Sequence, residues 1–164
     1  MYCVGKVSIK ATRLIEVTYE ALMRGIAIVR PGAALGDIGQ AIQSYVEAHK
    51  FSIVRDFCGH GVGRVFHEPP NVMHFYWERK PTEKDPAGRV VPGASLPLHE
   101  GMIFTIEPMV NAGRPETKVL EDGWTAVTRD RSLSAQFEHT IGVTADGCEI
   151  FTLSSKGWHK PPYL

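Results

Sequence analysis

Residues 101–110 read GMIFTIEPMV, and their alternation of side chains predicts a β-strand. In an extended chain, Thr105 and Glu107 lie on one face, and Phe104 and Ile106 lie on the other. Glu107 is therefore a carboxylate in an apolar segment, where an ionised group without a partner is strongly unfavourable. We expect Glu107 to bind a cation, to accept strong hydrogen bonds or to have a raised pKa.

A second strand is predicted over 134–143, SAQFEHTIGV. Alternation places Glu138 on the same face as the polar Gln136 and Thr140, whereas the adjacent His139 faces the apolar side. His139 is therefore interpreted as a hydrogen-bonded core histidine, and Glu138 as a second candidate site residue. From periodicity alone, both glutamates are either metal ligands or hydrogen-bonded structural carboxylates.

The rest of the chain predicts an α+β domain. Apolar spacing indicates a helix from the N-cap Ser8 to about residue 29, and a second over 35–50. Short strands are expected at 51–57, 123–130 and 148–153, the last closing a hairpin. Two helices followed by hairpin-connected strands favour an antiparallel sheet with both main helices on one face.

The segment 56–70, DFCGHGVGRVFHEPP, contains His60 and His67, which are either hydrogen-bonded interior histidines or residues of a functional site. Its glycines and its two prolines exclude a helix, so the segment is expected to be extended or looped. Alternating glycines are typical of close backbone approach or of positive φ rather than of a packed strand, and they leave room for a ligand. A phosphate-binding loop is disfavoured because the G-x-G-x-x-G spacing is absent.

Composition limits the possible function classes. With 164 residues and 43% hydrophobic content, the chain can form one domain. Eighteen basic residues balance eighteen acidic ones without clustering, so neither nucleic acid nor a membrane is expected as a partner. The three cysteines form no C-x-x-C pair, which disfavours a disulfide framework and suits a cytoplasmic protein.

Two segments of the chain are predicted to lack regular secondary structure. Residues 75–100 hold four prolines and no helical or strand periodicity, which predicts one long surface loop. This loop is either a binding element or a tolerated insertion. Residues 1–153 are expected to form the domain, and 154–164 an irregular tail.

Read in order, four segments resemble the catalytic half of bacterial type I methionine aminopeptidases. They are VGKVSIKATRLIEVTYEAL (4–22), CGHGVGRVFHEPP (58–70), GMIFTIEPMVNAG (101–113) and DGWTAVTRDRSLSAQFEHTIGVT (122–144). The resemblance runs over residues 1–153 and implies part of a pita-bread fold. It also implies a metal-dependent hydrolase that removes the initiator methionine from nascent proteins, with a peptide N-terminus as its partner.

The resemblance assigns roles by motif position. His60, Glu107 and Glu138 match metal ligands, and Glu107 also matches the group that transfers the proton. His67 matches the histidine that contacts the substrate near the scissile amide. Phe66 and Trp124 match residues that line the methionine pocket. In the family, two metal ions activate water and polarise the carbonyl, and carboxylates with one imidazole suit Mn, Fe, Co or Zn.

One difference between this sequence and the family pattern changes the expected activity. The family site also uses two aspartates from strands that precede the segment matched by MYCVG, and this chain begins at that segment. We therefore expect at most one metal ion and little activity from this chain alone, as in a truncated form of the enzyme. The alternatives are a non-catalytic binding or regulatory module, and a half-enzyme completed by a second copy or a missing N-terminal half, either of which implies association.

Overall fold

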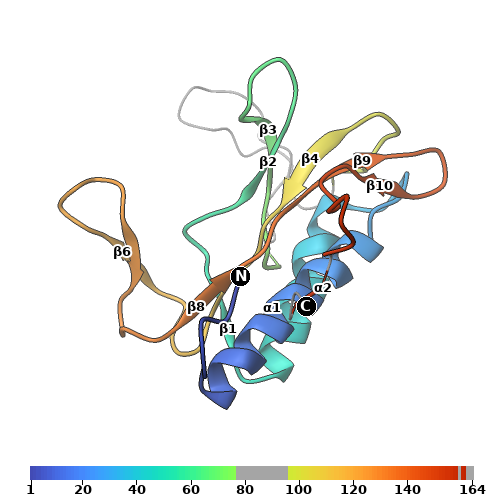
Figure 1. Ribbon diagram of the computed structural model, residues 1–164. Helices are drawn as coiled ribbons and strands as arrows, with labels where there is room; N and C mark the ends of the chain where they lie inside the picture. Colours follow the sequence, from blue (N-terminus) through green and yellow to red (C-terminus); the bar gives the residue numbers. More distant parts are fainter. Residues whose placement is uncertain (77–95, 159, 162–164) are drawn as a thin grey trace.

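The computed structural model describes residues 1–76, 96–158 and 160–161, and within them two helices precede all of the strands (Figure 1). The elements are α1 (Ile9–Ala27), α2 (Leu35–Ala48), β1 (Ser52–Ile53), β2 (Gly59–Gly61), β3 (Glu68–Val72), β4 (Ile103–Ile106), β5 (Met109–Asn111), β6 (Thr117–Val119), β7 (Ala126–Thr128), β8 (Ser134–Gln136), β9 (His139–Val143) and β10 (Cys148–Ile150). The predicted α+β class is confirmed. Most of the predicted 75–100 loop, residues 77–95, lies outside the described residues.

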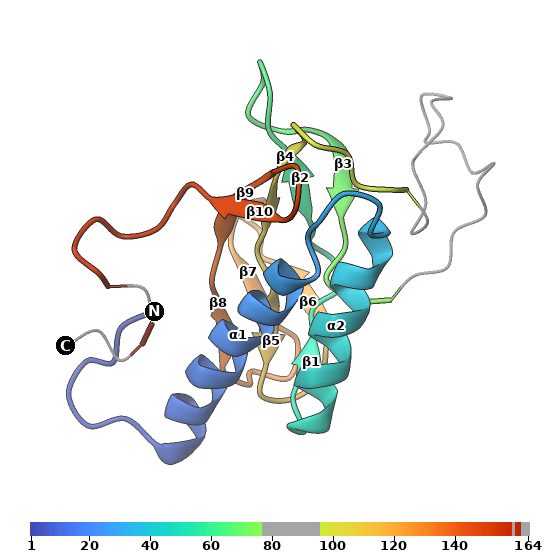
Figure 2. The same cartoon turned by 90° about the vertical axis from the view of Figure 1, so that its right-hand side faces the viewer.

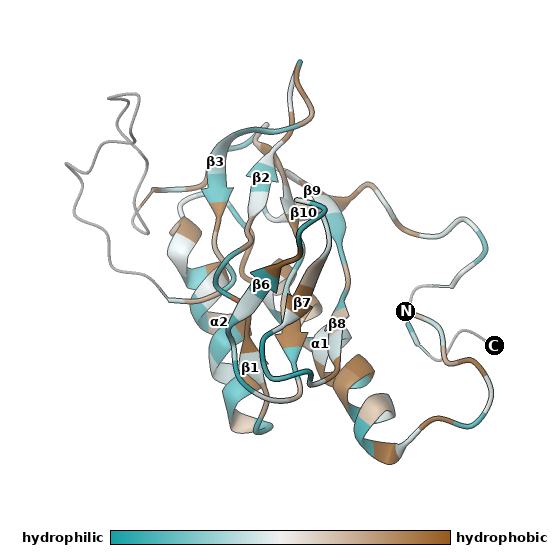
Figure 3. Cartoon of the chain, turned by 90° about the vertical axis from the view of Figure 1, so that its left-hand side faces the viewer, coloured by the Kyte–Doolittle hydropathy of each residue, from teal (hydrophilic) through white to brown (hydrophobic). Residues whose placement is uncertain are grey.

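Both helices form where the sequence predicts them. Ser8 caps α1, and its hydroxyl accepts a hydrogen bond from the Ala11 amide at 3.2 Å. The helices pack closely because Gly25 of α1 has no side chain; a Cβ there would lie 2.7 Å from Cδ1 of Ile42 on α2. Figure 2 shows the two helices side by side over one face of the strands, and Figure 3 shows the strands from the opposite side.

The core lies between the helices and the strands. It contains the buried side chains of Leu14, Leu22, Ile38, Ile42, Phe104, Ile106, Val110 and Ile141, among others. Burying such side chains contributes about 1.5–3 kcal/mol each relative to leaving them exposed. This packing fixes the helices against β4, β5 and β8, and the candidate glutamates lie in the gaps next to these strands.

All strand pairs of the described residues are antiparallel. The strand orders are β10-β9-β4-β2-β3, β1-β5-β8 and β6-β7. The hairpin predicted at the C-terminal end is confirmed by the pairing of β9 with β10. The strand predicted over 51–57 is much shorter, because only Ser52 and Ile53 pair with β5.

The two long predicted strands are each interrupted at a candidate glutamate. Residues 101–110 divide into β4 and β5 at Glu107 and Pro108, and Pro108 cannot donate a ladder hydrogen bond. The opposite strand divides between β8 and β9 at Phe137 and Glu138. Ile106 pairs with His139 before the gap, and Met109 pairs with Gln136 after it. The register is unchanged across the gap, so Glu107 and Glu138 lie opposite one another.

Two strands in the glycine-rich segment were not assigned from the sequence. β2 and β3 form a hairpin in which a side chain at Gly61 would collide with the Pro69 carbonyl oxygen. A side chain at Gly59 would collide with the Thr105 carbonyl oxygen of β4. The alternating glycines therefore mark close backbone approach, which is one of the two predicted reasons for them, and none of them has a positive φ. Two of them lie in the paired strand β2, contrary to the prediction, and bring it against β4.

No helix among the described residues is long and apolar enough to span a membrane.

Candidate metal centre

His60 is the central residue of β2 and lies between Gly59 and Gly61. Its Nδ1 lies 3.0 Å from the Gly61 carbonyl oxygen. A carbonyl oxygen can only accept, so Nδ1 carries the proton in this hydrogen bond and Nε2 is left as the electron-pair donor. Metal-ligating histidines typically make such a hydrogen bond through their second ring nitrogen.

Glu107 follows β4 and lies beside that free nitrogen. Its Oε1 is 3.7 Å from His60 Nε2. Burial raises the pKa of the Glu107 carboxyl, the Thr105 hydrogen bond and His60 lower it, and the negative charge of Glu138 raises it. The net shift of the Glu107 pKa is upward, as expected for a carboxylate in an apolar strand.

Glu138 completes a cluster of three candidate ligands. One ligand atom from each of His60, Glu107 and Glu138 can be chosen so that all lie within 4.8 Å of one another. The side chain of Glu138 is exposed, whereas those of His60 and Glu107 are largely buried. The unbroken register across the β4–β5 and β9–β8 gap explains why the two carboxylates meet.

The donor set fits a divalent metal ion. Protein ligands lie about 2.0–2.2 Å from a transition metal, so two ligands of one ion are separated by up to about 4.4 Å. The 4.8 Å limit of the cluster requires only a small closure around such an ion. One imidazole and two carboxylates suit Mn, Fe, Co or Zn, and they leave coordination positions open for water and substrate.

Two further predicted residues, Phe66 and His67, surround the His60 ring. The centroid of the His67 ring lies 4.3 Å from that of His60, and the Phe66 centroid lies 5.2 Å from it. Glu68 holds the loop that carries them, since its Oε1 accepts a hydrogen bond from the Val65 amide at 2.9 Å. Both side chains are exposed and border the cluster.

Trp124 is not brought to the cluster by any described contact. It lies in the turn between β6 and β7, and its side chain is 89% exposed. This hairpin extends away from the helices as a separate arm (Figure 1). The assignment of Trp124 to a substrate pocket therefore stays a prediction.

His74 supports the site and was not assigned a role from the sequence. Its side chain is buried, and its Nε2 accepts a hydrogen bond from the Glu107 backbone amide at 3.0 Å. Burial lowers the pKa of His74 to about 3, so its ring is neutral and able to accept. The only sequence signal is its place between Met73 and Phe75, which indicates an interior position.

His139 differs in part from its prediction. Its Nδ1 lies 2.8 Å from the Thr152 hydroxyl oxygen, so the histidine is hydrogen-bonded as expected. It is only half-buried, however, and does not belong to the core. Phe137 and Ile141, on the same face of the strand, are buried, so the alternation holds, but His139 lies at the start of β9, where its ring stays partly exposed.

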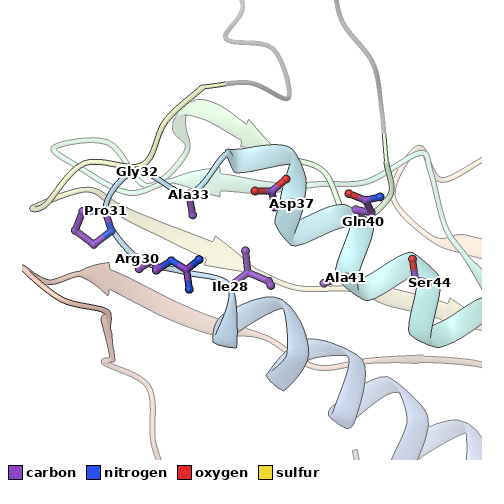
Figure 4. A pocket seen from close by; sticks show the side chains of 9 residues that line it. All are labelled: Ile28, Arg30, Pro31, Gly32, Ala33, Asp37, Gln40, Ala41 and Ser44. Atoms are coloured by element: carbon purple, nitrogen blue, oxygen red, sulfur yellow. The ribbon is translucent and has the colours of Figure 1, made fainter.

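A pocket of 710 Å³ lies at the turn between α1 and α2, away from these residues (Figure 4). Among the described residues that line it, Asp37 is the only one with a carboxylate, and its Oδ2 already accepts a hydrogen bond from the Ala34 amide at 3.2 Å. No histidine or cysteine is found in the part of its lining that the structure describes. The pocket therefore lacks the metal-binding and acid–base groups that the cluster around His60 provides.

Comparison with known proteins identifies relatives of the whole described domain. The family description "Metallopeptidase family M24" matches residues 1–145. A methionine aminopeptidase of Rickettsia prowazekii is 58% identical over 164 residues, which are 99% of this chain and 58% of the relative. The methionine aminopeptidase of Escherichia coli K12 is 50% identical over 153 residues, covering 93% of this chain and 53% of the relative. The chain thus spans little more than half the length of these relatives.

Comparison with solved structures finds the same relatives. The crystal structure of the Rickettsia prowazekii methionine aminopeptidase aligns with a TM-score of 0.80 at 57% identity, covering 92% of this chain and 55% of that one. The methionine aminopeptidase of Thermotoga maritima aligns with a TM-score of 0.79 at 42% identity, covering 91% and 54%. The Pyrococcus furiosus prolidase, at 20% identity and a TM-score of 0.64, covers 93% of this chain and 35% of the prolidase, and shares the fold alone.

Proposed function

Because this chain belongs to metallopeptidase family M24, we propose that it provides the metal-binding residues of an aminopeptidase that releases methionine from the N-termini of peptides and nascent proteins. The observation that carries this proposal is the convergence of His60, Glu107 and Glu138 within 4.8 Å. The similarity to two methionine aminopeptidases, at 58% and 50% identity, supports methionine as the released residue.

The three converging residues would hold one divalent metal ion, with Mn, Fe, Co and Zn all suited to the donors. When bound, the ion would supply Lewis-acid polarisation of the scissile carbonyl and a lowered pKa for water. His60 would bind through Nε2, because Nδ1 is committed to the Gly61 carbonyl. Glu107 and Glu138 would contribute one carboxylate oxygen each.

Glu107 has a second role in this proposal. Burial raises the pKa of its carboxyl above the ordinary value, which brings the carboxylate closer to the pH at which it can accept and return a proton. It would take a proton from the attacking water and deliver it to the leaving amine. Its backbone is fixed by His74 and its Oε1 by Thr105, so the proton acceptor is held in one place.

His67 and Phe66 would receive the substrate beside the ligands. His67 is exposed and adjacent to His60, where a neutral imidazole can donate to the oxygen that gains charge during attack. Phe66 offers an exposed apolar ring at the same edge of the site. A methionine side chain interacts favourably with such a ring. Trp124 would contribute to this pocket from the β6–β7 arm.

A non-catalytic binding module on the same fold is the second reading. Retention of the three candidate ligands together with His67 favours the enzyme, because a binding module does not require a proton acceptor beside an imidazole.

The N-terminal segment exposes apolar side chains, with Val4 90% and Ile9 88% exposed. We propose that further polypeptide covers this segment, either a second copy of this chain or the remainder of a longer protein. We also propose that the protein acts in the cytoplasm.

A hybrid enzyme tests the activity of these residues. Residues 1–164 would replace the region that they match in the Rickettsia prowazekii methionine aminopeptidase, and methionine release from a Met-Ala peptide would be measured with Mn²⁺. We expect the hybrid to release methionine, and its Glu107→Gln variant to lose about two to four orders of magnitude in rate, because the proton acceptor is removed.

The isolated 164-residue chain is expected to release little or no methionine, since its described residues bring only three ligands to one cluster. A folded hybrid without activity would contradict the proposed function. So would a hybrid whose rate is unchanged by Glu107→Gln. Release by the isolated chain at the rate of the hybrid would contradict the expected dependence on additional residues.

A further inference from the structure

Thr105 connects two of the three candidate ligands through its hydroxyl group. It lies in β4, and its side chain is 1% exposed. Its Oγ1 accepts a hydrogen bond from the His60 backbone amide at 3.0 Å and donates one to Glu107 Oε1 at 2.8 Å. One buried hydroxyl therefore contacts the strand that carries His60 and the carboxylate of Glu107.

The directions of these hydrogen bonds are fixed by their partners. A backbone amide can only donate, so the His60 N–H occupies a lone pair of the Thr105 oxygen. The hydroxyl proton is then free to be donated, and the ionised carboxylate of Glu107 accepts it. One lone pair of Oε1 is thereby committed, and the remaining lone pairs of the carboxylate stay available for a ligand role.

The close approach of β2 and β4 makes this arrangement possible. A side chain at Gly59 would collide with the Thr105 carbonyl oxygen, and would force apart the strands that bring the His60 amide to the hydroxyl. Thr105 is also β-branched, so its hydroxyl has little rotational freedom in the strand. The rotamer of the Glu107 side chain, which has three rotatable bonds, is thus restrained before any ligand arrives.

We infer that Thr105 is a positioning residue that orients the Glu107 carboxylate relative to His60 for metal binding. The inference rests on the proposed function of the His60, Glu107 and Glu138 cluster. Partners in the outer shell of a metal site typically contribute about 10- to 100-fold in metal affinity by orienting the ligands. Thr105 would act through Glu107 and would not itself touch metal or substrate.

Calorimetric titration of the 164-residue protein with Co²⁺ tests this inference. Thr105→Val keeps the shape of the side chain and removes the hydroxyl, so we expect Co²⁺ affinity to fall by about 10- to 100-fold. Thr105→Ser restores the hydroxyl and is expected to restore affinity to near the wild-type value. The visible absorption of bound Co²⁺ should differ between wild type and Thr105→Val and be recovered in Thr105→Ser, because it reports ligand geometry.

Thr18→Val provides a matched control for loss of a buried hydroxyl. Thr18 is 0% exposed in α1, and its Oγ1 donates to the Leu14 carbonyl oxygen at 2.6 Å, outside the cluster. This variant should bind Co²⁺ as the wild type does. Equal affinity and spectrum in wild type and Thr105→Val would overturn the inference, as would equal losses in Thr105→Val and Thr105→Ser.

Two further outcomes are distinguishable. If Thr105→Val does not fold, Thr105→Ala replaces it in the comparison with Thr105→Ser, and equal Co²⁺ affinity of these two variants would overturn the inference. If the folded wild type binds no Co²⁺ or Mn²⁺, the proposed metal site fails and the role of Thr105 fails with it. Metal binding by the wild type that is insensitive to the Thr105 hydroxyl overturns only the positioning role.

Discussion

Replacing His60 with alanine is expected to abolish binding of Mn²⁺ or Co²⁺ by the 164-residue protein. His60 is the only imidazole that the described residues bring to the cluster, and its Nε2 is available because Nδ1 donates to the Gly61 carbonyl. The alanine variant keeps two carboxylates, one of which is exposed. Loss of a direct ligand should exceed the about 100-fold upper effect of an outer-shell partner, which places binding below detection in calorimetry.

Two other histidines serve as controls for this prediction. His49 lies at the end of α2, outside the cluster, and its Nδ1 is 2.8 Å from the Tyr45 carbonyl oxygen. His67 touches the His60 ring but is assigned to substrate contact. Both His49→Ala and His67→Ala should retain one metal equivalent. Equal heats from wild type and His60→Ala would contradict the assignment of His60 as a ligand.

Lowering the pH from 7.5 to 5 is expected to reduce the free energy of unfolding by about 2 kcal/mol through His74 alone. Its folded-state pKa is about 3 because the ring is fully buried, whereas the ordinary value is 6.5. Between these values the unfolded chain binds a proton that the folded chain does not. The contribution of His74 to the free energy of unfolding is therefore fully present above pH 6.5 and is lost progressively as the pH falls towards 3.

Denaturant unfolding of wild type and His74→Gln at several pH values measures this contribution. Glutamine offers an amide oxygen to the Glu107 N–H but does not titrate, so the difference between the two proteins isolates His74. A chelator in the buffer removes any contribution from bound metal. Glu107 acts in the opposite direction, because its raised pKa favours proton uptake by the folded state, but it is present in both proteins. Parallel pH dependences of wild type and variant would show that His74 is not buried as described.

The helices could be predicted from local patterns. The Ser8 cap and the apolar spacing of the following residues define α1, and the spacing around Ile38 and Ile42 defines α2. Local physical chemistry suffices here because capping and amphipathic packing act within a few turns. The predicted N-cap of α1, Ser8, is the N-cap in the structure for the same reason.

The site needed information that no single segment contains. Alternation correctly placed Glu107 beside Thr105, and the structure joins their side chains by a hydrogen bond. It could not predict that β4 pairs with both β2 and β9, because pairing depends on contacts between residues far apart in sequence. The resemblance to the methionine aminopeptidases, based on whole motifs, supplied the grouping of His60 with Glu107 and Glu138.

The interruptions of the strands were even harder to predict from the sequence. The proline after Glu107 indicates one gap, but nothing in the segment around Phe137 indicates the matching gap on the opposite strand. A shared register across both gaps places the two glutamates opposite each other, and register is a property of the pair. His74 was missed for the same reason, since its partner is the backbone of a residue 33 positions away.

Anomalous X-ray diffraction from crystals of the 164-residue protein grown with Mn²⁺ tests the central claim most directly. We predict one strong peak bounded by His60 Nε2 and by the carboxylates of Glu107 and Glu138, about 2.0–2.2 Å from each ligand atom. A peak bound by other residues, with these three side chains free of it, would contradict the assignment of this cluster as the metal centre. So would the absence of any peak at the cluster in crystals saturated with Mn²⁺.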